Sequence, residues 1–323
     1  MQEFNIQGLF DIQSVRQSLA ESHNLHFAEN DKTQKEPTNS ISIIGESVEN
    51  VLGKITKELP LNIYIDGVER RYNIGGDPSC YYIQVASGAI FTDPLDNQNK
   101  LLDVQVMEMY LLFRDEGTKD IDYILNNYDP KQLNSFLVNP KLPLNMILRG
   151  LRFDLEKAMA KNYIKNNPSW TVIWDGSVSA SSDFNEGVDS KGFLGLTKTA
   201  DMSEYSDKER NEIFNLEFGE RSKVYKITDP KGFSYYTTFV RIRPPHPEKV
   251  DFGILQVQIP GFAFKDHWGE DAISKAFTNI ACHIIERAFD IANDPRWDRE
   301  LLPIAELEDY VGVILEDRIR QLA

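Results

Sequence analysis

Two aspartates that each follow a hydrophobic run are the residues of this sequence best placed for chemistry. Asp175 follows residues 171–174, TVIW, a β-branched and aromatic run that predicts a buried strand ending in a turn. Asp66 follows residues 61–65, LNIYI, and each aspartate precedes a glycine, as in many ordinary turns. Carboxylates at strand ends also suit Mg²⁺ and Mn²⁺, which prefer oxygen ligands. The spacing therefore leaves both an ordinary turn and a metal site open.

A glutamate and a lysine are expected near the strand that ends at Asp175. Glu156 lies four residues after Arg152 in a segment, 144–164, whose apolar spacing predicts a helix leading into that strand. The two side chains form either a surface ion pair or a group in which Glu156 points back to the end of the strand. Lys198 follows the next apolar run and lies close to Asp175 if the two runs form a hairpin. A lysine there can neutralise charge on a transferred phosphoryl group.

The composition is that of a globular protein. At 323 residues the chain can bury a sizeable core, as one large domain or two small ones. Its formal net charge of −15 argues against a protein that coats nucleic acid through its own positive field, although an enzyme acting on nucleic acid stays open. Cys80 and Cys282 lack the spacing of a zinc site, which favours two reduced thiols. No apolar run approaches the roughly 20 residues that span a bilayer and no signal-peptide pattern is present, so we expect a cytoplasmic protein.

Hydrophobic periodicity predicts both helices and strands along the chain. Residues 1–30 have the apolar spacing of an amphipathic helix, and the polar residues 31–41 predict a linker. Further helices are predicted over residues 48–58, 101–114, 121–127, 130–138, 144–164, 201–214, 271–292 and 301–322. Strands are predicted over residues 61–65, 81–91, 171–174, 192–196, 224–227, 235–243 and 252–259, with a loop over 179–191.

The order of the motifs resembles that of the NurA nuclease family from about residue 45 to the end of the chain. The resemblance rests on Asp66-Gly67 after an apolar strand, Arg152-x-x-x-Glu156 in a helix, and the runs IWDGSV at 173–178 and GFLGLTKT at 192–199. It implies an α/β fold with a ribonuclease-H-like mixed sheet flanked by helices, related to the nuclease domain of Argonaute. The expected domains are an N-terminal helical arm and linker over 1–44, and a nuclease domain over 45–323 with a helical insertion at about 95–165.

The resemblance also implies an activity and its partners. It implies a Mn²⁺- or Mg²⁺-dependent DNA nuclease with 5′-to-3′ exonuclease and single-strand endonuclease activity. It further implies a homodimer that works with a HerA-like hexameric ATPase in DNA end processing or defence. Asp66, Glu156 and Asp175 would then be metal-binding carboxylates of a two-metal site, with Lys198 beside them.

Two departures from the family pattern leave an alternative function open. Val68 stands where the first motif usually has serine, and the C-terminal motif is not matched directly. Counting back from Val311-Gly312-Val313, Asp309 takes the position of the last metal ligand, and Glu306 and His267 are alternatives. If none of these residues reaches the metal, the chain is a catalytically weak or inactive subunit that serves as an assembly platform for the translocase.

Overall fold

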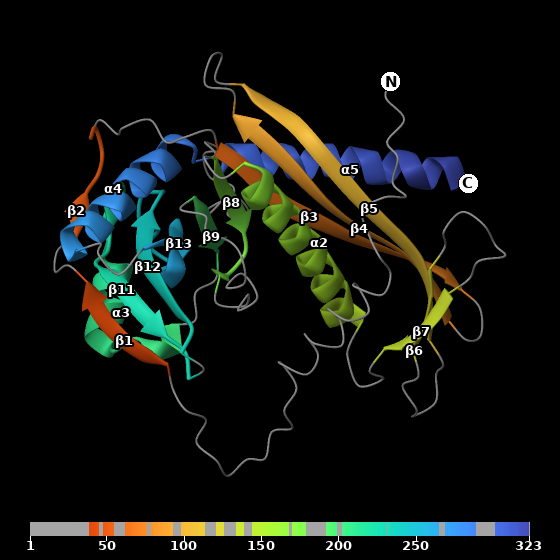
Figure 1. Cartoon of the computed structure of the whole chain (residues 1–323), viewed down its shortest axis with the longest axis horizontal. Coiled ribbons are helices and arrows are strands. Elements are labelled where there is room, and N and C mark those ends of the chain that lie inside the picture. The colour runs from red at the N-terminus through yellow and green to blue at the C-terminus, as the bar shows by residue number, and fades with distance from the viewer. Residues whose placement is uncertain are drawn as a thin grey trace, which may run out of the picture.

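The fold is built on one large mixed sheet with helices on both faces (Figure 1). The computed structural model describes residues 39–44, 48–54, 62–75, 79–92, 98–113, 121–125, 134–138, 144–167, 170–178, 192–198, 202–230, 232–264, 269–288 and 301–322. The predicted N-terminal helix, the loop over 179–191 and His267 lie outside these residues.

Five strands form the centre of the sheet and define its class. They are β3 (Asn62–Gly75), β4 (Ser79–Thr92), β5 (Asn99–Phe113), β8 (Thr171–Asp175) and β9 (Phe193–Thr197). Their spatial order is β5-β4-β3-β8-β9. The first three in sequence form an antiparallel meander, whereas β8 and β9 run parallel to β3. An antiparallel meander whose first strand is extended by two parallel strands is the ribonuclease-H-like sheet, the fold class that the resemblance implies.

Further strands extend the sheet at both ends. The β9 side continues antiparallel through β13 (Ile254–Pro260), β12 (Ser234–Arg241), β11 (Val224–Thr228) and β1 (Ser40–Ile44). The β5 side continues through β6 (Ile121–Leu125) and β7 (Asn134–Val138), which lie at the far end of the long strands β3 to β5 (Figure 1). The short strands β2 (Glu49–Asn50) and β10 (Glu220–Arg221) pair with each other, and β10 also pairs with β12.

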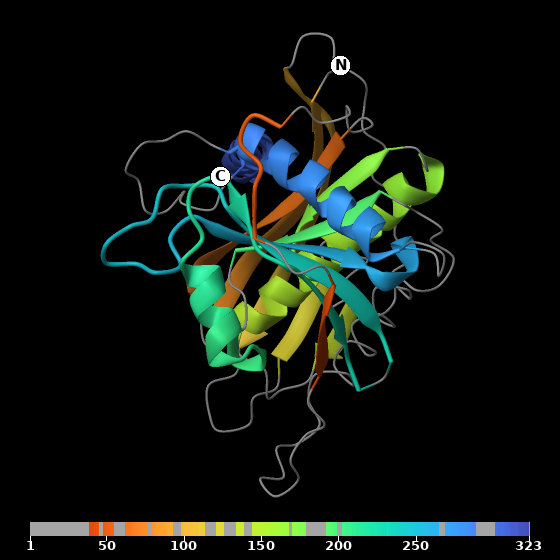
Figure 2. The same ribbon diagram turned by 90° about the vertical axis from the view of Figure 1, so that its left-hand side faces the viewer.

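The helices cover the two faces of this sheet. Helix α2 (Leu144–Asn166) packs on β3, β4 and β8, whereas α5 (Leu302–Leu322) packs on the opposite face along β3 and β4. Helix α4 (Glu270–Glu286) crosses the β11 to β13 end of the sheet, and Figure 2 shows it from that side. Helix α3 (Asp207–Phe214) and the 3-10 turns η4 (Met202–Glu204) and η5 (Gly261–Ala263) complete the described elements. No helix among them is long and apolar enough to cross a membrane.

Alternation along β3 decides which face each functional side chain occupies. Ile63 and Ile65 belong to the core under α2, whereas Tyr64 belongs to the core under α4 and α5. Because successive side chains of a strand point to opposite faces, Asp66 points to the α5 face and Gly67 to the α2 face. This register brings both helices to the same short stretch of β3.

Most of the predicted elements after residue 144 are confirmed. Helices are present in four of the predicted segments, as α2, α3, α4 and α5, with ends that differ by a few residues. Strands are present in the five predicted segments between 171 and 259, as β8, β9, β11, β12 and β13. Cys282 is a free, buried thiol, as expected.

The helices predicted between residues 101 and 138 are wrong, because β5, β6 and β7 occupy these segments. Leucine and methionine have high helix propensity, but β5 pairs with β4 over almost its whole length, and tertiary pairing overrides propensity. The segment also carries an alternation that the helical interpretation passed over, since Val104 and Val106 pack on the core. The expected helical insertion therefore contains a sheet extension before α2.

Four further predictions of local structure are wrong. The helix predicted over 48–58 contains the short strand β2, and Ser40–Ile44, expected in the linker, pairs with β11. Asp66 and Gly67 lie within β3 and do not form a turn. Strands β8 and β9 are parallel rather than a hairpin. Their first four residues are buried, which is typical of parallel strands covered on both faces.

The buried His283 predicts acid lability of the fold. Its Nε2 lies 2.8 Å from the Tyr64 hydroxyl, and burial, followed by the charge of Arg287, lowers its pKa to about 4. Below about pH 6.5 the unfolded chain takes up a proton that the folded chain resists, so stability decreases from pH 6.5 towards 4. We expect denaturant unfolding to show a loss of about 2 kcal/mol from this group between pH 7 and pH 5. His283→Gln should remove this share of the loss, and His246→Gln, at an exposed position, should retain it.

Candidate active site

Three carboxylates meet at the step where β8 ends and β3 continues. β3 pairs with β8 only over Asn62–Ile65, so Asp66 is the first residue of β3 beyond that pairing, and Asp175 is the last residue of β8. Glu308 comes from α5, which covers this face. One carboxylate oxygen from each of the three residues lies within 4.8 Å of the others. The group offers only hard oxygen ligands, which suits Mg²⁺ or Mn²⁺.

Asp66 is the most deeply buried member of the group. Its side chain is 1% exposed, and its Oδ2 has no hydrogen-bond partner among the described residues. Burial raises the pKa of Asp66 well above its ordinary value, and the charges of Asp175 and Glu156 raise it further, against the opposing charge of Lys198. A buried carboxylate with an open acceptor next to other carboxylates is stabilised by a cation. The residues present therefore fit a divalent ion.

Glu156 lies beside this group, on the α2 side of the sheet. It is 2% exposed, and its Oε2 accepts a 2.8 Å hydrogen bond from Trp174 Nε1. Burial raises its pKa to about 7, although Arg152 and the Trp174 hydrogen bond oppose this shift. The structure thus decides between the two interpretations of the Arg152–Glu156 pair: Glu156 is buried and faces the end of β8, and Arg152 is partly exposed.

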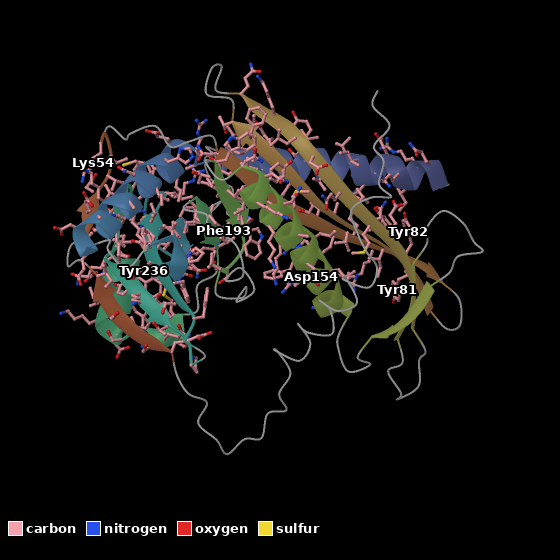
Figure 3. The ribbon with its side chains drawn as sticks, in the orientation of Figure 1. Lys54, Tyr81, Tyr82, Asp154, Phe193 and Tyr236 are labelled. Carbon is pink, nitrogen blue, oxygen red and sulfur yellow. The ribbon has the colours of Figure 1, made fainter. Side chains whose placement is uncertain are left out.

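The tryptophan that holds Glu156 is itself fixed by aromatic packing. Trp174 is fully buried, with its ring centroid 4.8 Å from that of Phe153 on α2 and 6.1 Å from that of Phe193 on β9. Side chains fill the space between α2 and strands β8 and β9, where Figure 3 labels Phe193. The predicted aromatic strand therefore serves the core and orients one carboxylate of the site.

Gly67 allows α2 to approach β3 closely. A Cβ atom at this position would lie 2.6 Å from Glu156 Oε1, 2.7 Å from the Ala86 carbonyl oxygen and 2.7 Å from Arg152 Cγ. The glycine of the Asp-Gly pair is thus required for packing rather than for a turn.

Two polar residues support Asp175 from the β9 side. Lys198 Nζ lies 2.6 Å from Asp175 Oδ2, so the predicted acid–lysine pair is present. It forms because the two strands are parallel and therefore end at the same edge of the sheet. Gln258 on β13 is buried, and its Oε1 accepts hydrogen bonds from Val178 N at 2.8 Å and Ser177 Oγ at 3.0 Å. It holds the turn that follows Asp175. Its sequence signal is the pair Gln256 and Gln258, at alternating positions of an otherwise apolar strand.

The structure brings Glu308 to the acidic group, whereas Asp309 lies outside it. Asp309 is exposed and lines a shallow hollow together with Glu306 and Tyr310. Glu306 accepts a 2.9 Å hydrogen bond from Asn99 Nδ2. Glu308 was not among the ligands predicted from the sequence, although the sequence contains a signal for its inward position. Glu308 interrupts a stripe of inward apolar residues with four- and three-residue spacing, at positions 304, 308, 311 and 315.

The fold and the site therefore define a class of structure. It is a ribonuclease-H-like sheet with a cluster of carboxylates at the end of β8, the fourth of its five central strands in sequence. No family model matches the sequence, and no curated protein matches it. Among solved structures, the crystal structure of A. aeolicus Argonaute is similar over 81% of this chain, with 10% sequence identity and a TM-score of 0.30. The chain spans 29% of the length of that Argonaute chain.

Proposed function

We propose that this protein is a metal-dependent nuclease that hydrolyses phosphodiester bonds of DNA. The observation that carries the proposal is the convergence of Asp66, Asp175 and Glu308, with the open, buried Oδ2 of Asp66, on a ribonuclease-H-like sheet. A divalent ion held by these residues would supply Lewis-acid chemistry for phosphodiester hydrolysis.

The protein side chains around that position have separable roles. Asp66, Asp175 and Glu308 would hold the ion, and Lys198, 2.6 Å from Asp175, places a positive charge beside the position of a phosphate. Glu156, fixed by Trp174, adds a carboxylate on the opposite side of Asp66. Gln258 orients the turn after Asp175 and so the direction of that carboxylate.

The finer proposal is a nuclease of the NurA type. The ordered motifs of the sequence support it, since Asp66, Glu156 and Asp175 occupy the positions of that family's metal-binding carboxylates. On this proposal the chain has 5′-to-3′ exonuclease and single-strand endonuclease activity, dimerises and works with a HerA-like hexameric ATPase. The net charge of −15 is compatible with this arrangement, because the ATPase ring would bring the DNA to the site.

Cleavage of end-labelled single- and double-stranded DNA in Mn²⁺, Mg²⁺ or EDTA tests the proposal. We expect cleavage with a divalent ion and none in EDTA. Glu308→Gln should lower the rate by about 100-fold or more, because it removes one charged ligand from the group. The matched control is Asp309→Asn on the next residue of α5, which should keep at least half of the wild-type rate.

One outcome would count against the proposed nuclease, and another against the choice of Glu308 as a ligand. Folded wild-type protein that cleaves no DNA in either metal, with or without a HerA-like ATPase, would favour the non-catalytic platform suggested by Val68. A normal rate for Glu308→Gln together with loss in Asp309→Asn would place the C-terminal ligand where the family pattern predicts it.

A further inference from the structure

A protein cation already stands inside the acidic site. Arg152 Nη1 lies 3.5 Å from Asp66 Oδ1, 3.2 Å from Glu156 Oε1 and 3.2 Å from the Gly67 carbonyl oxygen. Arg152 Nε lies 2.9 Å from Glu69 Oε2. One guanidinium therefore contacts three carboxylates and one backbone carbonyl, on the α2 side of Asp66.

The two carboxylate oxygens of Asp66 belong to two different sets of carboxylates. Its Oδ1 belongs to the set that Arg152 fills, together with Glu156 and Glu69. Its Oδ2 is buried without a hydrogen-bond partner among the described residues, and the set on the other side comprises Asp175 and Glu308. The first set thus has a guanidinium in contact with three carboxylates. In the second set Lys198 Nζ lies 2.6 Å from Asp175 Oδ2, and Asp66 Oδ2 still offers an open acceptor.

We propose that the site takes one divalent cation, held by Asp66, Asp175 and Glu308, and that the Arg152 guanidinium stands in place of a second one. The inference rests on the proposed function, and it replaces the two-metal site that the family resemblance implies. Removal of the guanidinium would open a second cation position between Asp66, Glu156 and Glu69.

The chemistry of arginine keeps the guanidinium positively charged at ordinary pH, so it continues to stand in place of a second divalent cation. A guanidinium is charged at any pH a folded protein experiences, so Arg152 cannot leave the carboxylates by losing its proton. Two cations a few ångströms apart repel strongly in a partly buried site, which disfavours a divalent ion entering next to it. A divalent ion there would also need its ligand oxygens at about 2.1 Å, inside the space that Nη1 occupies.

The oxygens that Arg152 contacts would become available as ligands for a second cation once the guanidinium is removed. Its ion pairs with Glu156 Oε1 and Glu69 Oε2 are close, yet both oxygens are buried without an aligned hydrogen bond. They are held by charge rather than by directed N–H bonds. Once the guanidinium is absent, these two oxygens and Asp66 Oδ1 form a second all-carboxylate set.

Counting bound Mn²⁺ by isothermal titration calorimetry and by the loss of the free Mn²⁺ electron paramagnetic resonance signal tests the inference without any cleavage assay. We expect one ion per wild-type chain and two per Arg152→Ala chain. Arg152→Lys should bind one ion, because the ammonium keeps a positive charge near the same carboxylates. Arg149→Ala is the matched control, since this exposed arginine lies one turn earlier on α2, and it should bind one ion.

A second substitution locates the gained ion. In the Arg152→Ala background, Glu69→Gln should return the count to one, because Glu69 belongs only to the set that Arg152 fills. Circular dichroism with and without Mn²⁺ establishes that each variant is folded, and the wild-type count stands even if Arg152→Ala does not fold.

The remaining outcomes overturn the inference in distinguishable ways. Two ions per wild-type chain would overturn it and leave the proposed nuclease intact. One ion in both wild type and folded Arg152→Ala would show that the guanidinium does not occupy a cation position. No ion bound to the wild-type chain would overturn both the inference and the proposed function.

Discussion

Asp66→Asn is expected to abolish metal-dependent cleavage while making the metal-free protein more stable. The substitution removes the carboxylate at the centre of the site, so we expect the cleavage rate to fall by about 1,000-fold or more. The same carboxylate is buried next to other carboxylates, and a neutral amide of equal size avoids both the desolvation and the repulsion. The melting temperature of the metal-free protein should therefore rise by about 2 °C or more.

Thermal melts with and without Mn²⁺ test separately the loss of metal binding and the gain in stability of the metal-free protein. Mn²⁺ at about 100 times its dissociation constant should stabilise the wild type by about 2.7 kcal/mol, and should stabilise Asp66→Asn much less. Asp309→Asn, an exposed change of the same chemistry, should behave as wild type in both melts. A metal-free Asp66→Asn protein that melts below wild type would show that the ion pair with Arg152 outweighs the repulsion.

Gly67→Ala is expected to damage both the fold and the site through a single methyl group. Its Cβ would lie 2.7 Å from the Ala86 carbonyl oxygen, which is backbone and cannot move independently of the sheet. It would also lie 2.6 Å from Glu156 Oε1. We expect a loss of about 2 kcal/mol in denaturant unfolding and a loss of about 100-fold in cleavage rate, because overpacking displaces Glu156.

Gly150→Ala provides the matched control for this prediction. Gly150 lies in α2, and a Cβ there meets nothing within 4 Å. Alanine in a helix interior should stabilise the protein by about 0.5–1 kcal/mol and leave the cleavage rate unchanged. Equal effects of the two substitutions would refute the close approach of α2 to β3 as the reason for glycine at position 67.

The sequence allowed the outline of the site to be predicted because its signals are local. The strand Thr171–Asp175 is buried and continuous in hydrophobicity, and its acid lies at its end as expected. Glu156 follows from helical spacing and its position before that strand. The pairing of Lys198 with Asp175 was also predicted, but for the wrong reason. A hairpin would place the ends of the two strands at opposite edges of the sheet, whereas parallel strands end at the same edge.

The features of the fold and the site that were not predicted depend on tertiary contacts, which no local sequence pattern indicates. The segment of β5 has residues of high helix propensity and becomes a strand because β4 pairs with it. Asp66 lies within β3 because β4 continues alongside it past the end of β8. The choice of Glu308 over Asp309 depends on the rotation of α5 against the sheet, since adjacent helical residues point about 100° apart.

The position of Glu308 on α5 ties the assembly of the site to the synthesis and docking of that helix. Asp66 and Glu308 are separated in sequence by most of the protein, and their contact is among the most non-local that the fold makes. Non-local contacts form slowly in folding, because a long loop must close before they contribute. During synthesis the carboxylate from α5 is also the last to be made. A chain that has not been synthesised through α5, or in which α5 has not docked, therefore lacks the third ligand at the site, and the capacity to bind the ion appears only when the sheet is covered on both faces.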